Sequence, residues 1–456
     1  MTSVRDFGAR GDGKTDDAQA IQHAIQKGDG NLHFPRGDYL ISRSIQIPLQ
    51  MHGRLSIDGA IGTARILMNG AGPALNLIGS HRRTAEPTHF MDEQWRRERM
   101  PIVQGLEIVG QHAQADGIRV EGVMQPTLHQ LLIRKCRHGI HLNNRDRNVL
   151  ISDCHIYDNS GIGVFLDAVN LHQINIHGNH ISYCKQGGLK IVASEIRNIQ
   201  ICSNDIEYNY DAKLEGCADV CFDCRDGTVR EGTLVGNTVQ ARESPGGANV
   251  RFLGAKDHPN AIGLFTISGN LIGSQARALD LHACRAVVIT GNSIYSGYRH
   301  AIWAENSEHL VIGANTIDHN PEYRGNSTDQ IVIRNCRNVS MTGLILQHSR
   351  AANDPVTSSI EMRGCQNMNI VGVQILGARV RGIALENCQV VRIADSTIRG
   401  TVDDKTYRAA LTVDGQCSQV MVVNNFLGRG SDGAFELPRE RGTAAGNVML
   451  GGPTGA

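Results

Sequence analysis

The stretch Ile267-Ser268-Gly269-Asn270-Leu271-Ile272 places an asparagine in a short turn between two apolar segments. Asparagine suits a turn that stacks on its own copies, because its amide can bond the same amide one layer above and below. A catalytic asparagine would not recur, so we interpret the repeated residue as structural. Close variants of this phrase are centred on Asn179, Asn204, Asn237, Asn292 and Asn315.

A second phrase follows each copy and alternates apolar with polar residues. This period of two predicts strands and not helices, and a repeat of roughly 22 to 31 residues is typical of a solenoid. The sequence therefore predicts an all-β fold, a right-handed single-stranded parallel β-helix of about twelve coils. Its first inward residues are expected at Ile118, Ile140, Ile162, Leu189, Val220, Val250, Leu279, Ile302, Ile331, Ile360, Ile383 and Leu411.

The repeat also bears on domain organisation. A chain of 456 residues would by itself suggest two or three domains, but a continuous repeat favours one. We expect a single β-helix domain over 1–456, with an N-terminal cap region over 1–50 and regular coils over 101–430. A short amphipathic capping helix is expected over 16–25 with Asp16 as its N-cap, and a short surface helix over 95–99.

Composition excludes several classes of function. The chain balances 45 basic against 45 acidic residues, which argues against a nucleic-acid or anionic-membrane surface. No apolar run is long enough to span a bilayer. The first residues lack an apolar signal core, so the chain as written is not expected to be a secretory precursor, although a trimmed chain would look identical. The compartment therefore stays open, and an oligomer is compatible with the sequence.

Twelve cysteines are too sparse for a disulfide scaffold. We expect a buried column of small side chains and no metal site. The alternative is a metal site at Cys217, Cys221 and Cys224, which strand alternation disfavours because it points Cys221 outward and Cys224 inward. The expected column contains Cys224, Cys284, Cys336, Cys365, Cys388 and Cys417.

Residues 8–15, Gly-Ala-Arg-Gly-Asp-Gly-Lys-Thr, fit the pattern of a phosphate-binding loop. That loop works only between a buried strand and a helix of a βαβ unit. The preceding residues are too few and too polar for such a strand, and no alternation of strands and helices follows. We therefore do not expect nucleotide binding.

Residues 4–17, followed by Ala20-Ile21 and Phe34-Pro35-Arg36-Gly37-Asp38-Tyr39, resemble the opening of the pectate-lyase-like superfamily. That group includes polygalacturonase-type glycosidases, pectate-lyase-3-type proteins and phage tailspikes. The resemblance implies a right-handed β-helix and a carbohydrate-active role, but the superfamily hosts hydrolases, lyases, epimerases and transferases. The Gly-His-Gly and Arg-Ile-Lys motifs of polygalacturonases are absent, so no catalytic residue is carried over.

Stacking of the coils suggests where a site lies. Equivalent residues on successive coils lie about 4.8 Å apart, so a polysaccharide on one face meets side chains from several coils. The outward positions of the middle coils gather carboxylates, basic residues and Trp303, one of two tryptophans. An outward tryptophan beside carboxylates is typical of a sugar platform. Tyrosine-rich turns at 208–215, 295–300 and 322–324 lie next to these positions.

Paired carboxylates on neighbouring coils suit glycoside hydrolysis, which needs two carboxyl groups about 5 to 9.5 Å apart. We expect like charges to raise the pKa of one of them and so create the acid. The predicted catalytic residues are Asp223, Asp280, Glu305 and His282. The predicted substrate-binding residues are Asp219, Arg251, Trp303, Arg334, Lys190, Tyr210 and Tyr298.

Two alternatives remain open. A lyase or C5-epimerase would need a base, supplied by Lys190, Arg251 or His282, and Ca²⁺ held by Asp219, Asp223 and Asp280 could bridge the uronate carboxylate. A hydrolase needs no cofactor. A non-catalytic, tailspike-like glycan-binding protein should spread its aromatic residues along the face, with no carboxylate cluster. In each case the expected partner is a polysaccharide or oligosaccharide, with an anionic one favoured by the arginines.

Overall fold

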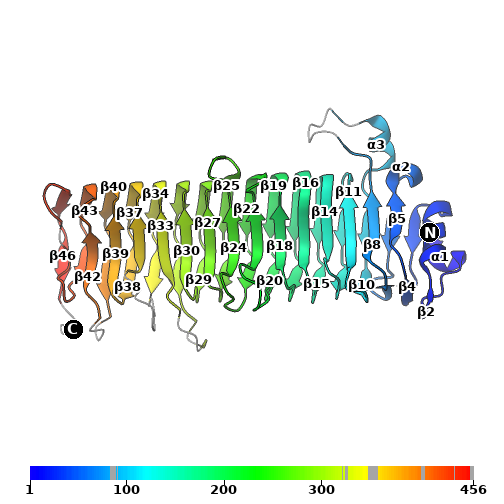
Figure 1. The fold of residues 1–456 in the computed structure, drawn as a ribbon, viewed down its shortest axis with the longest axis horizontal. Helices are drawn as coiled ribbons and strands as arrows, with labels where there is room; N and C mark the ends of the chain where they lie inside the picture. Colours follow the sequence, from blue (N-terminus) through cyan, green and yellow to red (C-terminus); the bar gives the residue numbers. More distant parts are fainter. Residues whose placement is uncertain are drawn as a thin grey trace. The chain divides into compact units, whose positions relative to one another are not determined.

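The computed structural model describes residues 1–82, 89, 91–320, 322–323, 327–347, 358–401, 406–435 and 437–451. These residues form parallel β-coils (Figure 1). The coils belong to two compact units, Met1–Thr233 and Leu234–Ala456. The prediction of an all-β parallel β-helix is confirmed. There are about 15 turns where twelve were predicted, because residues before 101 also form coils. A single domain over 1–456 stays a prediction.

Each coil contributes strands to three faces, and side chains alternate between the interior and the surface. In the first unit, the first face consists of β5 (Ile45–Pro48), β8 (Gly72–Ile78), β11 (Ala115–Glu121), the start of β14 (Ile140–Ser152), the start of β16 (Ile162–His177), β18 (Gly187–Val192) and β21 (Ala218–Asp223). The second face consists of β1 (Thr2–Ser3), β3 (Asn31–His33), β6 (Ser56–Asp58), β9 (Ile102–Gln104), β12 (Thr127–His129), the ends of β14 and β16, β19 (Glu195–Cys202) and β22 (Thr228–Val235). The third face consists of β2 (Asp12–Asp16), β4 (Gly37–Ile41), β7 (Ala64–Met68), β10 (Leu106–Gly110), β13 (Leu132–Arg134), β15 (His155–Tyr157), β17 (His180–Ser182) and β20 (Asp205–Glu207).

The second unit repeats this plan. Its first face consists of β24 (Ala248–Leu253), β27 (Arg277–His282), β30 (His300–Glu305), β33 (Gln330–Arg334), β36 (Ile360–Arg363), β39 (Arg381–Glu386) and β42 (Ala409–Val413). The second face consists of β25 (Ile262–Ser268), β28 (Arg285–Thr290), β31 (Glu308–Ile312), β34 (Arg337–Thr342), β37 (Gln366–Val371), β40 (Gln389–Ala394), β43 (Ser418–Val423) and β45 (Gly442–Ala445). The third face consists of β23 (Thr238–Gln240), β26 (Leu271–Gly273), β29 (Ser293–Tyr295), β32 (Thr316–Asp318), β35 (Ile345–Gln347), β38 (Gln374–Ala378), β41 (Thr397–Gly400), β44 (Phe426–Gly428) and β46 (Val448–Leu450).

The inward apolar ladder of the first face matches the prediction in the second unit, where Val250 to Leu411 lie in register. In the first unit one rung is wrong. Ile140 pairs with Val164 and not with Ile162, which pairs with Gly187. The error arose because Gly161-Ile162 looks like Gly139-Ile140, although the chain is shifted there by two residues.

The asparagine row is confirmed as a buried ladder. In the first unit, the Asn179 side-chain amide donates to Asn204 Oδ1 over 3.0 Å. In the second unit, Asn270 donates to Asn292 and Asn292 donates to Asn315, both over 2.9 Å. Each amide also bonds backbone groups, so the turn of each coil is tied to the next.

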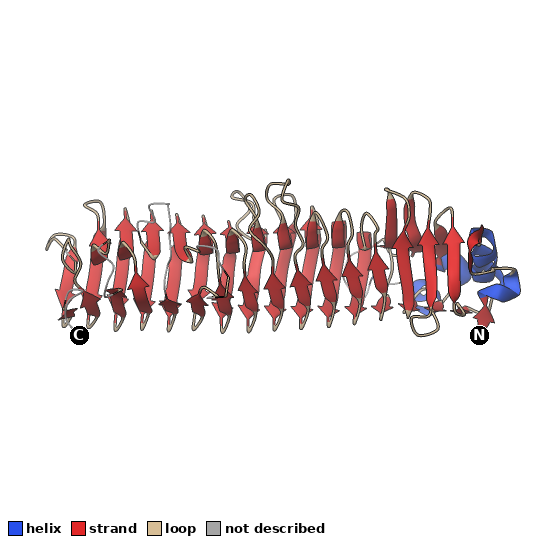
Figure 2. Ribbon diagram, turned by 90° about the horizontal axis from the view of Figure 1, so that it is seen from below, coloured by secondary structure: helices blue, strands red, loops and turns tan. Residues whose placement is uncertain are grey.

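Helices are few among the described residues and lie in the first hundred (Figure 2). They are a 3-10 turn, Val4–Phe7, and helices α1 (Ala18–Lys27), α2 (Leu49–His52) and α3 (Asp92–Arg97). Helices are therefore found near both predicted positions. The cap of α1 is Asp17 and not Asp16; the Asp17 carboxylate accepts from the backbone of Arg10 and Gly11. In the described part of the chain, no helix is long and apolar enough to span a membrane.

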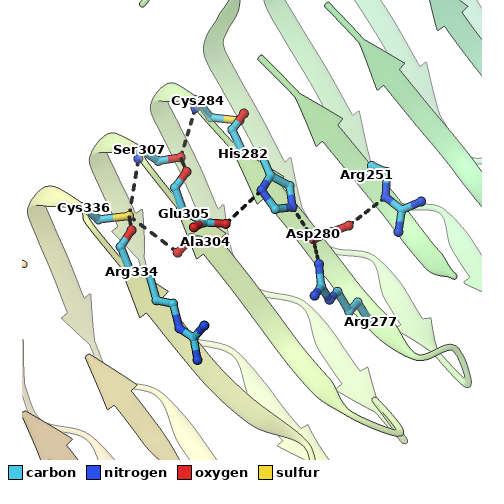
Figure 3. Close-up of polar contacts among 10 residues, drawn as sticks. All are labelled: Arg251, Arg277, Asp280, His282, Cys284, Ala304, Glu305, Ser307, Arg334 and Cys336. Carbon is cyan, nitrogen blue, oxygen red and sulfur yellow. Dashed lines mark hydrogen bonds and ion pairs between the residues drawn. The ribbon is translucent and has the colours of Figure 1, made fainter. Parts of the chain in front are cut away.

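The predicted column cysteines are all buried. In the second unit Ser307 stands between Cys284 and Cys336 in this column, and further along it the Cys388 backbone amide donates to Cys417 Sγ over 3.3 Å (Figure 3). Cys221 was predicted to point outward; it pairs in register with Lys190 and is only 7% exposed.

Candidate functional site

The first face of the second unit carries a cluster of ionisable side chains on two neighbouring strands, β27 and β30. Asp280 lies beside Trp303, and His282 lies beside Glu305, because the two strands pair in register. Leu279 and Leu281 point into the core, so alternation places Asp280 and His282 on the outside. Figure 3 shows the side chains of Asp280, His282 and Glu305 in one line.

Asp280 is the centre of the cluster and is almost fully buried, at 1% exposed. One carboxylate oxygen accepts from Arg251 Nε over 2.7 Å. The other accepts from Arg277 Nη1 over 2.7 Å and lies 2.9 Å from His282 Nε2. This carboxylate thus ties together side chains from two coils (Figure 3).

These partners decide the charge of Asp280. Burial alone would raise its pKa, but the hydrogen bond from His282 and the charges of Arg251 and Arg277 outweigh burial. The pKa of Asp280 therefore lies well below its usual range. Like charges therefore do not raise the pKa of this member of the predicted set, because its nearest charged neighbours are cations.

Glu305 is more exposed than Asp280. Its side chain is 31% exposed and that of His282 27%, against 2% for Asp280. Glu305 Oε2 lies 3.5 Å from His282 Nδ1. His282 thus sits between a buried ionised carboxylate and an exposed one, which is an arrangement that can hold and transfer a proton.

Trp303 is half-buried between two guanidinium groups and is not an open platform. Arg277 Cζ lies 4.3 Å and Arg334 Cζ 4.6 Å from the centre of its ring. The His300 ring meets it edge-on at 4.8 Å, and burial and the nearby Arg277 charge lower the pKa of His300 to about 3. Arg334 is also bound to Glu361 over 3.0 Å. These cation–π contacts hold two arginines on Trp303, and one of them, Arg334, pairs in register with Glu305.

The remaining predicted residues of the second unit play smaller parts. Arg251 keeps the predicted register but is 8% exposed, and it bonds the Gly246 carbonyl as well as Asp280. Tyr298 lies half-buried in the turn before β30, and burial raises its pKa. Of the predicted turn 322–324, residue 324 lies outside the described residues.

The first unit holds the other predicted residues. Asp219 was predicted to point outward but is 1% exposed, and it accepts from the Asn209 backbone and side chain. Asp223 pairs with its neighbour Arg225 over 2.5 Å. Burial would raise the pKa of Asp223, but the bond from Arg225 lowers it below its usual value, so like-charge repulsion does not make it an acid. Lys190 pairs in register with Cys221 on the first face, and Tyr210 is half-buried in the turn before β21.

The carboxylates proposed for Ca²⁺ do not fit that ion. Asp219 is turned inward onto Asn209, Asp223 is held by Arg225, and Asp280 is held by two arginines. A calcium site needs several free oxygen ligands, and these are already occupied. We therefore derive no step through Ca²⁺.

Sequence reasoning missed residues in both units. Arg277 was not predicted and His300 was predicted only as part of the turn 295–300, because both lie at the starts of their strands, two residues before the tracked apolar positions. In the first unit, the shift at Ile162 hid a cluster on the first face. There His141 stacks on Phe165 at 5.0 Å and lies 3.3 Å from Asp167. Burial lowers the pKa of His141.

Two family models match this chain. A model described as right-handed beta helix region matches residues 95–239 and 253–427. A model described as rhamnogalacturonase A/epimerase, pectate lyase-like, matches residues 1–60.

Similar proteins are found over short stretches or at low identity. The chain is 44% identical over 59 residues to plasmin and fibronectin-binding protein A of Streptococcus pneumoniae, covering 12% of this chain and 8% of that protein. It is 52% identical over 44 residues to alginate lyase 7 of Azotobacter vinelandii, covering 9% and 5%. These matches span under a tenth of the relatives' lengths. The structure of pre-mature bacteriophage phi29 gene product 12 is similar over 98% of this chain and 55% of that one, with 13% identity and a TM-score of 0.52, a likeness of fold alone.

Proposed function

Because this chain belongs to the right-handed β-helix family and begins with a pectate-lyase-like segment, we propose that its second unit acts on an acidic polysaccharide. The proposed reaction removes the proton beside a uronate carboxylate and eliminates the neighbouring glycosidic oxygen. The observation that carries the proposal is the line Asp280–His282–Glu305, which ends in a carboxylate whose side chain is 31% exposed and which pairs in register with Arg334.

The exposures of the carboxylates favour proton abstraction over hydrolysis. Hydrolysis needs two carboxyl groups that reach the substrate. In this cluster the side chains of Asp280 and Glu361 are 2% and 10% exposed, and both are paired with arginine. Only Glu305 among these three carboxylates is substantially exposed. A hydrolase with Asp223 and Asp280 as its pair is therefore the weaker proposal.

Each residue of the cluster has a part in the proposed reaction. Glu305 accepts the C5 proton, and His282 can take that proton through Nδ1. The C5–H electron pair forms the C4–C5 double bond, the C4–O bond breaks with its electron pair on the leaving oxygen, and that oxygen takes up a proton from water. Asp280 positions His282 and keeps its Nε2 engaged.

The two arginines supply the charge that this chemistry needs. A carboxylate beside the reacting carbon must be neutralised before the proton becomes acidic enough to remove. Arg277 and Arg334 lie against Trp303 with side chains 29% and 34% exposed, and each guanidinium has more donors than its one carboxylate partner uses.

The test is to incubate the protein with uronic-acid, neutral and sulfated glycans and to follow three signals together. Ultraviolet absorbance reports the unsaturated product, reducing ends report any cleavage, and deuterium uptake from solvent at C5 reports proton exchange. We expect absorbance to rise with uronate polymers. Glu305→Gln should lower the rate by at least about 100-fold, because a positioned acid or base contributes roughly that much.

His309→Gln is the matched control, since His309 is an exposed histidine of the same unit outside the cluster. Reducing ends without new absorbance would mean hydrolysis, and deuterium uptake without cleavage would mean epimerisation. Retained binding with silence in all three signals would favour a glycan-binding protein without activity.

A further inference from the structure

The second face of the first unit carries a hollow lined by uncharged side chains, which shares no residue with the clusters around Asp280 and His141. It has a volume of about 560 Å³, within the range of about 300–1,000 Å³ that is usual for ligand sites. We call it the amide groove. It is bordered by a corner column, Gln125, Asn148, Gln173 and Asn198, and a strand column, Thr127, Leu150, Asn175 and Gln200.

The regular stacking of the coils builds this groove. The strand column is in register from Thr127 to Gln200 through β12, β14, β16 and β19. The corner residues have positive φ values between 52° and 66°, so the chain bends there, two residues before each strand residue. Each coil therefore gives two side chains to one trough, repeated about every 4.8 Å.

The lining has no ionisable group. Met100 and Val149 complete it, and both are apolar. One residue in five of this chain is charged, so about two of the ten lining residues would carry a charge if the lining had the average composition of the chain. None of them does. An ionic ligand would find no counter-charge in this groove, whereas a neutral polar ligand would meet no desolvated charge.

The backbone of the face narrows the choice of ligand further. Inner strands such as β14 and β16 are hydrogen-bonded to a neighbour on both sides. An extended peptide therefore cannot add as a further strand, and recognition has to come from side chains. A carboxamide both donates and accepts hydrogen bonds, as a sugar hydroxyl does.

The amides are partly prearranged, and apolar surface lies among them. Asn148 donates its side-chain amide to Gln173, which fixes two neighbouring corner residues. Leu150 is 38% and Met100 58% exposed, and they offer the apolar contact that the face of a sugar ring requires. We propose that the amide groove binds a neutral glycan chain, running across the coils.

This proposal does not depend on the proposed reaction. The groove lies in the first unit and lacks charge, whereas the cluster around Asp280 lies in the second unit and carries arginines. Glu305→Gln should abolish turnover of an acidic glycan and leave groove binding unchanged, so the two proposals can fail separately.

The experiment is affinity electrophoresis of the full chain through gels containing soluble neutral glucans, mannans or galactans, with a uronate polymer for comparison. We expect retardation by at least one neutral glycan. Gln173→Ala and Gln200→Ala should each weaken it about 5-fold, which corresponds to losing one hydrogen bond of about 1 kcal/mol. Gln200→Glu, which keeps the size of the side chain and adds a charge, should also weaken it.

Gln419→Ala is the matched control, because Gln419 is a corner glutamine with φ 55° in the second unit. It should bind as the unchanged protein does, and all variants should share one thermal midpoint. The proposal would be overturned if no neutral glycan retarded the protein, or if all variants were retarded equally. It would also be overturned if only the uronate polymer retarded the protein and the groove variants weakened that retardation.

Discussion

Two buried aspartates of the second unit show how differently a carboxyl group can be held. Asp280 is surrounded by two arginines and a histidine, and its pKa lies below the usual range. Asp329 is 0% exposed, accepts from the Gly297 amide and the Ser327 hydroxyl, and faces no cation among its hydrogen-bond partners. Burial raises the pKa of Asp329 to about 7. Similar burial therefore gives shifts of opposite sign.

Removing the charge of Asp280 should be costly. Asp280→Asn leaves Arg251 and Arg277 without their shared counter-charge, and breaking a buried ion pair typically lowers the free energy of unfolding by about 3–5 kcal/mol. Asp223→Asn is the matched control, because its partner Arg225 is 64% exposed and an exposed pair contributes about 0–1 kcal/mol. Urea unfolding of both variants measures the difference; equal losses would contradict this account of Asp280.

The pKa values of these two aspartates predict that their contributions to folding stability change with pH in opposite directions. The low pKa of Asp280 means that its contribution to stability is present above about pH 4 and is lost as pH falls below that value. Asp329 keeps its proton in the folded state up to about pH 7 but loses it near pH 4 when unfolded. Its contribution to stability therefore falls as pH rises from about 4 to about 7.

Asp329→Asn should remove this fall in stability with rising pH, since asparagine cannot ionise. Between about pH 4 and pH 7, the unfolding free energy of the unchanged protein should fall by up to roughly 1.4 kcal/mol per pH unit more steeply than that of the variant. Denaturant titrations at several pH values test this. Parallel curves for the two proteins would mean that Asp329 is ionised throughout.

At the scale of the strand, alternation and stacking made the candidate site predictable. Placing Leu279 and Ile302 on the inward ladder was enough to put Asp280, His282, Trp303 and Glu305 together. Their partners could not be predicted in the same way. Which guanidinium reaches Asp280 depends on side-chain direction at the start of β27, and the pattern of apolar residues does not contain it.

The same method failed where the pattern was ambiguous. Gly161-Ile162 imitates Gly139-Ile140, so the ladder slipped by two residues, and Phe165 was not matched with His141. A slip of two keeps the inward and outward sides correct, which is why the fold prediction survived the error. The prediction for Asp219 was wrong for another reason. Its carboxylate accepts a hydrogen bond inside the turn, in the same way as the amide oxygens of the neighbouring asparagines do.

The asparagine ladder is an element whose loss can be measured. Asn292 Oδ1 accepts from Asn270, and Asn292 Nδ2 donates to the Ile267 carbonyl over 3.1 Å. Asn292→Ala leaves buried donors and an acceptor unpaired, at about 1–3 kcal/mol each. We expect at least about 2 kcal/mol loss of unfolding free energy. Asn338→Ala, an asparagine at an exposed corner of the same unit, should cost far less.

At the scale of the whole molecule, the chain is two units of stacked coils whose interiors are aliphatic and sulfur-rich. All twelve cysteines are free, and all except Cys202 are buried. A thiol reagent should therefore react quickly with about one thiol in the native protein and with all twelve after denaturation. Rapid reaction of several thiols in the native protein would mean that coils open readily.

Composition and periodicity were sufficient for the architecture because a solenoid depends on contacts between neighbouring repeats. The number of coils was underestimated because the first hundred residues vary too much for a single phrase to recognise, although strands β4, β7 and β8 lie there. Chemistry is less predictable than architecture because it depends on a few side chains and their charges.

The hydrogen bonds between successive asparagines of the ladder run in one sense along the chain. Asn270 donates its backbone and side-chain amides to Asn292, and Asn292 donates both of its own to Asn315. Each coil is thus completed by the one made after it. Removing coils from the C-terminal side takes the partner from two asparagine donors, whereas removing them from the N-terminal side takes it from one oxygen and one side-chain donor. Buried amide donors tolerate isolation less well than carbonyl oxygens. A coil that forms before its C-terminal neighbour therefore keeps unpaired asparagine donors until that neighbour is in place.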